Sequence, residues 1–304
     1  MTSAAMSAPA GVLGVISPRG RVLPVVTVVA VILALWYLLA VALNYTRVSE
    51  LLAGADPDYT ISDVIKGAWT MERPVLPAPD QIATDLWNAT IGLKVTSKRS
   101  LVYHAGVTAS ATLLGFLFGT ILGIVLAAGI VHVRTLDRSL MPWIIASQTV
   151  PILAIAPMVI VVLGNVGITG LIPKSLISAY LCFFPVTIGM VKGLRSPDPL
   201  QMDLMRTYSA GTMQVFWKLR VPASIPFLFA SLKVAIAISL VGAIVAELPV
   251  GGAGLGARLL SGSYYGQMVQ IWSALFMAAF LGMALVYAIA GIEWLILRRA
   301  GARA

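Results

Sequence analysis

Long stretches without a charged residue divide the chain, and its expected elements follow from them. These stretches run from Val22 to Thr46, Ser100 to Val133, Ser139 to Pro173, Ser175 to Val191 and Leu259 to Ile292. A helix needs about 20 mainly apolar residues to cross the hydrocarbon core of a bilayer. We therefore expect each stretch to hold one membrane-spanning helix.

A sixth apolar stretch, Ile225 to Leu248, is interrupted by Lys233 and ends beside Glu247. The long stem of a lysine lets its ammonium group reach the lipid headgroups, so we expect Lys233 to snorkel. The predicted fold is an all-α membrane protein with six transmembrane helices, the last five forming a core. The helices are expected at residues 22–43, 106–131, 140–163, 171–191, 225–248 and 271–297.

Basic residues gather in one set of loops, and this sets the expected orientation. Short cytoplasmic loops carry an excess of Lys and Arg, whereas long loops carry little orientation signal. The two short loops on the opposite side hold only Lys174 and Arg258. We therefore expect both termini to be cytoplasmic. The basic residues on that side are Arg19, Arg21, Arg134, Arg138, Lys192, Arg195, Arg206, Lys218, Arg220, Arg298, Arg299 and Arg303.

Three regions follow from this layout. Residues 1–21, rich in Ala, Ser, Gly and Pro, are expected to form a cytoplasmic tail before an uncleaved first helix, because the apolar run exceeds a signal-peptide core of about 7–15 residues. Residues 22–100 hold that helix and an extracytoplasmic segment. A helical pattern opens there at Pro79, with Ile82, Leu86 and Ala89 on one face, which fits either internal packing or docking of a partner. Residues 101–298 form the transmembrane core.

The composition excludes an ordinary soluble enzyme, a disordered chain, a basic nucleic-acid-binding domain and a disulfide-stabilised scaffold. Apolar residues make up 59% of the 304-residue chain and charged residues 11%, against about 25% charged in an average soluble chain. No phosphate-binding loop, zinc-protease motif or hydrolase elbow is present, so we expect no catalytic residue and no bound cofactor. His104 and His132 lack ligand-spaced partners, and no metal site is expected. The net charge of +9 is interpreted as loop bias rather than nucleic-acid binding.

Small residues and prolines mark the interior of the predicted spans. Gly115, Gly119 and Gly123 share one helix face, which favours close packing against a neighbouring helix. Prolines interrupt the third span at residues 142, 151 and 157 and the fourth at residue 185, and we expect kinks beside a cavity there. Three polar side chains precede Pro151 and are candidates for the lining of a path or for helix–helix contacts. They are Ser147, Gln148 and Thr149.

The loop from residue 193 to residue 222 carries the most organised pattern outside the spans. Ser196-Pro197-Asp198-Pro199 offers a helix N-cap followed by a proline in the first turn. Tyr208-Ser209-Ala210-Gly211 interrupts that helix, and Thr212 is a candidate cap for a second short helix. Val215, Phe216 and Leu219 form an apolar stripe on it. Such a hairpin fits insertion into a partner's groove, although periodicity alone favours a surface hairpin folded back on its own bundle.

This loop resembles the motif of binding-protein-dependent ABC transporter permeases, written Glu-Ala-Ala, three residues, Gly, nine residues, Ile-x-Leu-Pro. Asp203-Leu204-Met205 stands at the first three positions, Ser209 at the glycine and Leu219 to Pro222 at the end. The sequence also resembles the nitrate/sulfonate/taurine branch of that family. The segments that carry this likeness are Arg206-Thr207-Tyr208, Gln214 to Lys218, Leu232 to Ala235, Ala246-Glu247 and Gly251 to Gly256.

The resemblance implies a bacterial inner-membrane subunit that forms the translocation path of an importer. Family members pair as two permeases, usually as a homodimer, with a cytoplasmic ATPase that uses ATP and Mg and an extracytoplasmic solute-binding protein. Because Ser209 replaces the family glycine, we expect Gly211 to supply the flexible backbone of the turn. The implied ATPase contacts are Asp203, Tyr208, Ser209, Ala210, Gly211, Thr212, Phe216 and Pro222.

Two further interpretations remain at this stage. Glu247 with the glycines after it is a candidate for the translocation path or for holding the outer loop. A secondary carrier or channel powered by an ion gradient is the alternative function, and its marks would be an inverted repeat and ion ligands inside the membrane. The solute is left open between nitrate, sulfonate, taurine and pyrimidine-precursor types.

Overall fold

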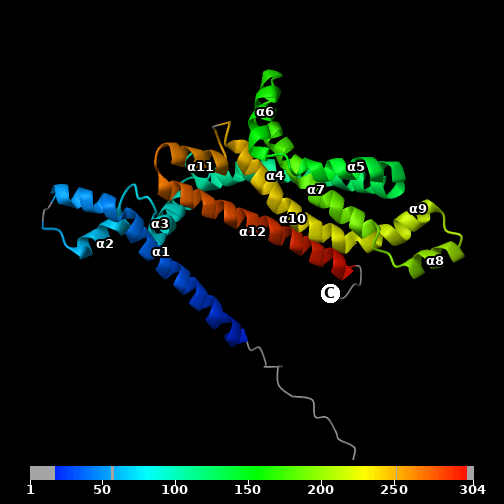
Figure 1. The fold of residues 1–304 in the computed structure, drawn as a ribbon, viewed down its shortest axis with the longest axis horizontal. Helices are drawn as coiled ribbons and strands as arrows, with labels where there is room; N and C mark the ends of the chain where they lie inside the picture. The colour runs from blue at the N-terminus through cyan, green and yellow to red at the C-terminus, as the bar shows by residue number, and fades with distance from the viewer. Residues whose placement is uncertain (1–17, 56–57, 251, 300–304) are drawn as a thin grey trace, which may run out of the picture. The chain divides into compact units, whose positions relative to one another are not determined.

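In the computed structural model of the chain, residues 18–55, 58–250 and 252–299 are described, and their regular elements are all helical (Figure 1). The predicted all-α class is confirmed. The elements are α1 (Pro18–Ala55), α2 (Ile61–Thr70), α3 (Pro79–Thr90), α4 (Leu101–His132), α5 (Arg134–Ser147), α6 (Ile152–Asn165), α7 (Leu171–Leu194), α8 (Pro199–Thr207), α9 (Thr212–Val215), the π-helical segment η1 (Phe216–Arg220), α10 (Val221–Glu247), α11 (Leu255–Tyr264) and α12 (Met268–Arg299).

Within the described ranges, five helices are long and apolar enough to cross a membrane, and five predicted spans fall on them. The predictions at 106–131, 171–191, 225–248 and 271–297 match α4, α7, α10 and α12 within a few residues. The first span is longer than predicted, since α1 continues to Ala55. Of the predicted tail, residues 1–17 lie outside the described residues and residues 18–21 belong to α1.

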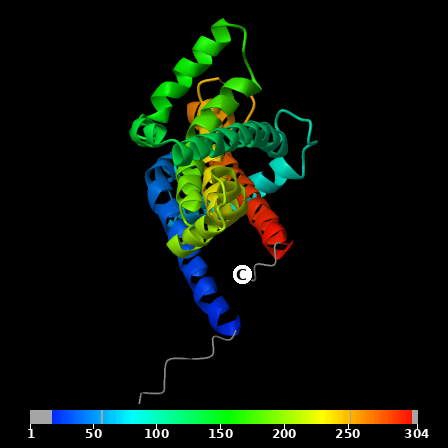
Figure 2. The same ribbon diagram turned by 90° about the vertical axis from the view of Figure 1, so that its right-hand side faces the viewer.

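The third predicted span, 140–163, is not one helix. It is divided into α5 and α6, which meet at 98°, and Figure 2 shows α6 standing away from the helices around it. Pro151 lacks an N–H group and its ring would clash with the carbonyl of Ser147 in a continuous helix. The freed Ser147 carbonyl instead accepts a hydrogen bond from Tyr180 Oη at 2.6 Å. At Pro185 the predicted interruption is absent, because α7 continues through it.

The predicted cavity lies beside this break. A hollow of about 340 Å³ is lined only by side chains from α4, α6 and α7, among them Ile152, Leu176 and Tyr180. Its lining is apolar apart from the Tyr180 hydroxyl, which is turned to the Ser147 carbonyl. The break therefore leaves an apolar hollow and no free backbone acceptor at Ser147.

The described residues fall into two compact units, one up to Gln81 and one from Ile82. In the first unit, α2 packs on α1 through Val48, Val64 and Ala68. Asn44 of α1 is fully buried, and its amide donates to the Ala68 and Leu76 carbonyls at 3.3 and 2.9 Å while its Oδ1 accepts from Val75 N at 2.7 Å. One side chain thus ties the segment after α2 to α1.

The second unit is built around α4, α7 and α10, which lie side by side (Figure 1). The predicted glycine face packs on α7, since a Cβ at Gly115, Gly119 or Gly123 would come closer than 3.0 Å to α7 atoms. A hydroxyl chain joins the same helices: Ser178 Oγ contacts Ser239 Oγ at 2.6 Å, and Ser239 Oγ donates to Thr112 O at 3.0 Å. We call this three-helix contact the glycine–serine seam.

Candidate functional site

The predicted loop helices form a hairpin at the end of α7, which we call the α8–η1 hairpin (residues 199–220). Its first helix begins as predicted, with Asp198 as N-cap and Pro199 in the first position. Asp198 Oδ1 accepts from Leu200 N at 2.8 Å, and Gln201 Oε1 accepts from Asp198 N at 3.3 Å. Two otherwise free backbone donors at the helix start are satisfied locally, which fixes where α8 begins.

The turn after α8 depends on Ser209. Its φ is +50°, in the left-handed region, and it is the only described residue other than glycine with a positive φ. Ser209 N donates to Arg206 O at 2.8 Å and Ala210 N to Met205 O at 3.0 Å, the pattern of a Schellman cap. The expectation that Gly211 supplies the flexible backbone is wrong, because its φ is −66°. The serine itself adopts the conformation that favours glycine.

The second arm of the hairpin turns its predicted apolar stripe inward. Phe216 is half-buried and lies edge-on to His132 with 4.6 Å between ring centres. Phe216 also packs against the core cluster that contains Leu194 and Phe229. Thr212 is the first residue of α9 and not its cap, since Gly211 precedes the helix and donates from its N–H to Gln214 Oε1 at 3.1 Å. The stripe therefore holds the hairpin to its own bundle.

The outer surface of the hairpin is apolar and exposed. Leu200 and Leu204 of α8 and Tyr208, the residue at its C-cap, follow one another at four-residue spacing and are 77%, 56% and 77% exposed. Met213 and Trp217 on the second arm are exposed as well. The sequence interpretation named Tyr208 but missed the other four, although their spacing and apolar nature were readable. We call these five residues the hairpin surface.

The remaining predicted contact residues lie around this surface. Asp203 is exposed and pairs with Arg206 within α8 at 2.9 Å. Ala210 is half-buried, Gly211 and Thr212 are exposed, and Pro222 lies exposed at the start of α10. All of the predicted contact residues except Phe216 are thus at or near the surface of one hairpin. Their role in docking stays a prediction.

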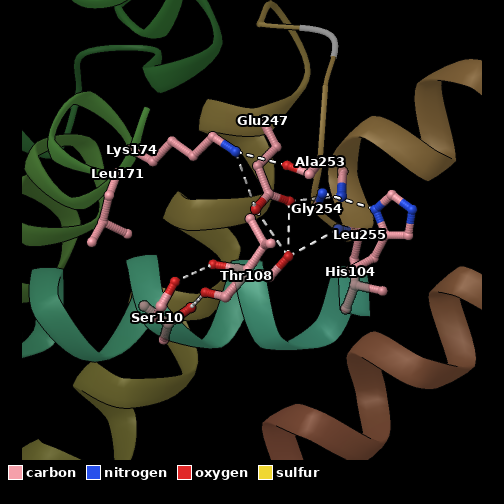
Figure 3. A network of polar contacts seen from close by, with 12 residues as sticks. His104, Thr108, Ser110, Leu171, Lys174, Glu247, Ala253, Gly254 and Leu255 are labelled. Atoms are coloured by element: carbon pink, nitrogen blue, oxygen red, sulfur yellow. Dashed lines mark hydrogen bonds and ion pairs between the residues drawn. The ribbon is translucent and has the colours of Figure 1, made fainter. Parts of the chain in front are cut away.

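The far end of α10 carries a buried polar cluster, shown in Figure 3. Glu247, the last residue of α10, is fully buried. Both of its carboxylate oxygens accept from Thr108 Oγ1 of α4 at 2.9 Å, and Oε2 also accepts from Gly256 N of α11 at 2.9 Å. Lys174 Nζ of α7 lies 3.8 Å from Oε1 and donates to Ala253 O at 2.8 Å.

The same cluster fixes the segment that enters α11. Thr108 Oγ1 accepts from Leu255 N at 2.9 Å, and His104 Nδ1 accepts from Gly254 N at 2.9 Å. Since Nδ1 is an acceptor, the proton of a neutral His104 ring is on Nε2, which donates to Lys98 O at 2.9 Å. Both ring nitrogens are occupied. We call Glu247, Thr108, Lys174, His104 and the 253–256 backbone the Glu247 network.

This geometry assigns Glu247 a contact role: it accepts from the backbone amide of Gly256 in the first turn of α11 and from the Thr108 hydroxyl of α4. The polar residues at the α5–α6 break are elsewhere. Gln148 and Thr149 are exposed, and Thr149 Oγ1 donates only to Ala146 O at 2.8 Å. No hydrogen bond or ion pair in the described ranges joins them to Glu247. The predicted path residues therefore form two separate places, and their part in translocation stays a prediction.

Lys233 departs from its predicted behaviour. Its ammonium group is paired with a carboxylate of α12, where Nζ lies 2.7 Å from Glu293 Oε2. The expectation of snorkelling is therefore wrong. Glu293 was missed because it immediately follows a charge-free stretch and has no partner nearby in the sequence. Across the parts of the chain that are described, no three metal-ligating side chains gather together.

Helices long and apolar enough to span a membrane, with the α8–η1 hairpin between two of them, are typical of an integral membrane transport component. The chain belongs to the family described as binding-protein-dependent transport system inner membrane component, whose profile matches residues 119–300. It is therefore a multi-pass inner-membrane permease subunit, as the loop motif indicated.

Three relatives illustrate the match. A probable ABC transporter permease protein of Haemophilus influenzae is 27% identical over 224 residues, covering 74% of this chain and 85% of the relative. The riboflavin transport system permease protein of Chloroflexus aurantiacus is 31% identical over 185 residues, covering 61% and 65%. The formylaminopyrimidine transport permease protein of Halalkalibacterium halodurans is 28% identical over 225 residues, covering 73% and 85%. Sulfonate and nitrate permeases also match, which confirms the predicted resemblance.

Proposed function

We propose that this chain is the permease subunit of an ATP-driven importer of a small solute, coupled to a separate cytoplasmic ATPase. The observation that carries the proposal is the hairpin surface. Five large apolar side chains lie exposed on a hairpin whose own inward stripe is already packed. A contiguous exposed apolar patch is a typical protein-interaction surface. An ATPase groove that receives α8 would cover it.

In this proposal the hairpin transmits motion and the chain performs no bond chemistry. Apolar anchors at the centre of an interface supply most of its binding energy, and Leu200, Leu204 and Tyr208 are suited to that part. The polar and small residues around them, Asp203 and Ser209 to Thr212, would line the rim, with Pro222 at its edge. Phe216 would act from the inside by fixing the hairpin to the bundle. Approach of the ATPases would then rotate the permeases as bodies.

The hairpin side is proposed to be cytoplasmic, with both termini on that side, because the short loops there hold most of the basic residues. The region from residue 22 to residue 100 would face the opposite side after the first helix, and residues 101–298 would form the transmembrane domain. The Glu247 network would then lie at the outer end, where a solute-binding protein delivers its cargo. A second copy of this chain would complete the path, with Ser147, Gln148 and Thr149 as candidate lining.

The solute class is proposed from the relatives, whose printed names include riboflavin, formylaminopyrimidine, aliphatic sulfonates and nitrate. These solutes share small size and no common charge, so the proposal extends to a small polar solute. ATP and Mg would be bound by the partner and not by this chain. An ion-gradient carrier, the earlier alternative, finds no support in the family match.

The docking proposal is tested by one matched pair of substitutions. Leu200→Asp places a charge on the hairpin surface, whereas Ile61→Asp does so on the first turn of α2, and both side chains are 77% exposed. We expect Leu200→Asp to abolish co-purification of the co-expressed ATPase and Ile61→Asp to leave it unchanged. Normal co-purification and normal ATP-dependent uptake with Leu200→Asp would refute the assignment of the hairpin.

The energy source is tested separately. Uptake into membrane vesicles should require internal ATP and persist when a protonophore abolishes the proton gradient. Uptake that stops with the protonophore while ATP is held constant would show that an ion gradient drives transport.

A further inference from the structure

The pair formed by Lys233 and Glu293 lies within the apolar part of the bundle. Lys233 lies about 18 Å along the helix from Val221 and about 21 Å from Glu247, near the middle of α10, at 1.5 Å per residue. Its partner Glu293 is on α12, and the distance from Lys233 Nζ to Glu293 Oε2 is 2.7 Å. Glu293 lies about 9 Å along α12 from Arg299, so the pair lies inside the two helices, with the lysine near the middle of its helix and the glutamate closer to the end of its own. Ionisable groups at such depth face a bundle interior or a water-filled space, because lipid does not solvate them.

The pair is not enclosed by its own chain. The side chain of Lys233 is 34% exposed and that of Glu293 is 20% exposed. Within the described residues neither makes another hydrogen bond or ion pair, so two of the three ammonium donors have no protein acceptor. In the Glu247 network, by contrast, the carboxylate is fully buried and every oxygen has a donor. The pair between α10 and α12 is thus incomplete in a single chain.

The neighbouring surface leaves room beside the ammonium group. Residues three before and four after Lys233 on α10 are Ala230 and Ala237, and both are exposed. Positions three and four apart share a helix face, so the charge lies between two small side chains. The ammonium group is the more exposed partner, and its long stem lets it turn from Glu293 to another acceptor.

We propose that this face of α10 lines the solute path and that Lys233 binds the negatively charged group of a small anionic solute, which takes the place of Glu293 during transit. The inference rests on the proposed transport function and narrows it to anions at this step. Glu293 keeps the lysine neutralised when the path is empty, and thereby limits the cost of a charge at that depth.

The test measures charge selection beside Lys233 in membranes that contain the full chain with its co-expressed ATPase. Cys182 is replaced by Ala, since it is the only cysteine. Ala237→Cys then reports on the proposed path. Ala34→Cys in α1 is the control, because it is exposed among Val31, Leu35 and Leu38, which are large and apolar. The probes are the anionic sulfonatoethyl and the cationic trimethylammonioethyl methanethiosulfonates.

We expect the cysteine at 237 to react with both reagents and the cysteine at 34 with neither. The anionic-to-cationic rate ratio at 237 should fall about five- to tenfold with Lys233→Met, rise with Glu293→Gln and stay unchanged with Lys233→Arg. Comparing the ratio at one cysteine removes the intrinsic difference between the reagents.

Two results would overturn the inference. An unreactive cysteine at 237 would show that lipid or a second copy covers this face. A reactive cysteine whose anionic-to-cationic rate ratio does not change with Lys233→Met would show a water-filled path without anion binding. The ATPase activity of the same membranes separates these results from failure of the proposed function, since ATP hydrolysis coupled to uptake can persist while the cysteine at 237 is unreactive.

Discussion

The two ends of α10 differ in how far the chain completes them by itself. At the Glu247 end, a buried carboxylate has donors from α4 and α11 and a nearby ammonium group from α7. At the hairpin end, Leu200, Leu204 and Tyr208 are more than half exposed. Buried polar groups with all partners present fix one conformation. Exposed apolar side chains are instead typical of a surface that binds another protein. The Glu247 end of α10 is thus fully paired within this chain, whereas the hairpin end leaves an apolar surface exposed.

The largest expected effect on stability comes from removing the carboxylate at the centre of the Glu247 network. Glu247→Ala removes the acceptor of the Thr108 hydroxyl and the Gly256 N–H and the counter-charge of Lys174. We expect a loss of about 3–5 kcal/mol in the free energy of unfolding. Glu247→Gln keeps an acceptor for Gly256 and should cost less. Denaturant unfolding of the detergent-solubilised chain measures both. A change below about 1 kcal/mol for Glu247→Ala would show that this end is not a stabilising network.

A smaller loss is expected at the backbone that the network holds. Gly254 has a φ of +132° and ψ of 164°, a conformation that is essentially restricted to glycine, and a Cβ there would overlap the Glu247 carboxylate. Gly254→Ala should cost at least about 2 kcal/mol. Gly252→Ala is the matched control, because a Cβ there has no neighbour within 4 Å. Equal stability of the two variants would contradict the close approach of the 253–256 segment to Glu247.

At the hairpin end we expect the Ser209→Gly substitution to stabilise the turn after α8. Ser209 holds a positive φ at the cap of α8, which costs a residue with a Cβ about 1 kcal/mol relative to glycine. Ser209→Gly should therefore slow hydrogen exchange of the Ala210 amide about fivefold, whereas Ser209→Ala should not. Faster exchange in the glycine variant would mean that the serine side chain contributes more to the turn than its backbone strain removes.

The smallest effect on stability is expected on the hairpin surface. Leu204→Ser changes an exposed side chain with no partner, and the free energy of unfolding should stay within about 0.5 kcal/mol of the parent. The same variant should weaken binding of the ATPase. A clear loss of stability in the isolated chain would show that Leu204 already packs on its own bundle, and the contrast between the two ends would disappear.

Much of the helical layout was predictable from local pattern. Charge-free runs located α4, α7 and α12, and the apolar stretch around Lys233 located α10. The spacing of Gly115, Gly119 and Gly123 indicated the face that packs on α7. Asp198 and Pro199 marked the start of α8. Each of these signals lies within one segment of chain, where helix geometry alone decides which residues share a face.

Features that depend on other helices were missed. Lys233 pairs with Glu293 only because α12 packs beside α10. The sequence around either residue does not indicate this pairing. The prolines signalled that the third span would bend, but the division into α5 and α6 depends on Tyr180, which satisfies the freed carbonyl from α7. The turn residue is Ser209 and not Gly211, because the cap of α8 requires its positive φ at residue 209, whichever side chain stands there.

The glycine–serine seam sets a reference frame for measuring how this protein works. A Cβ has no room at Gly115, Gly119 or Gly123, or at Gly242 of α10 against Ser178, so α4, α7 and α10 cannot slide past one another without losing contact along their length. Distances between spectroscopic labels placed on these three helices should stay constant through a transport cycle. Labels on α6 or on the hairpin, read against that fixed trio, would report the moving parts.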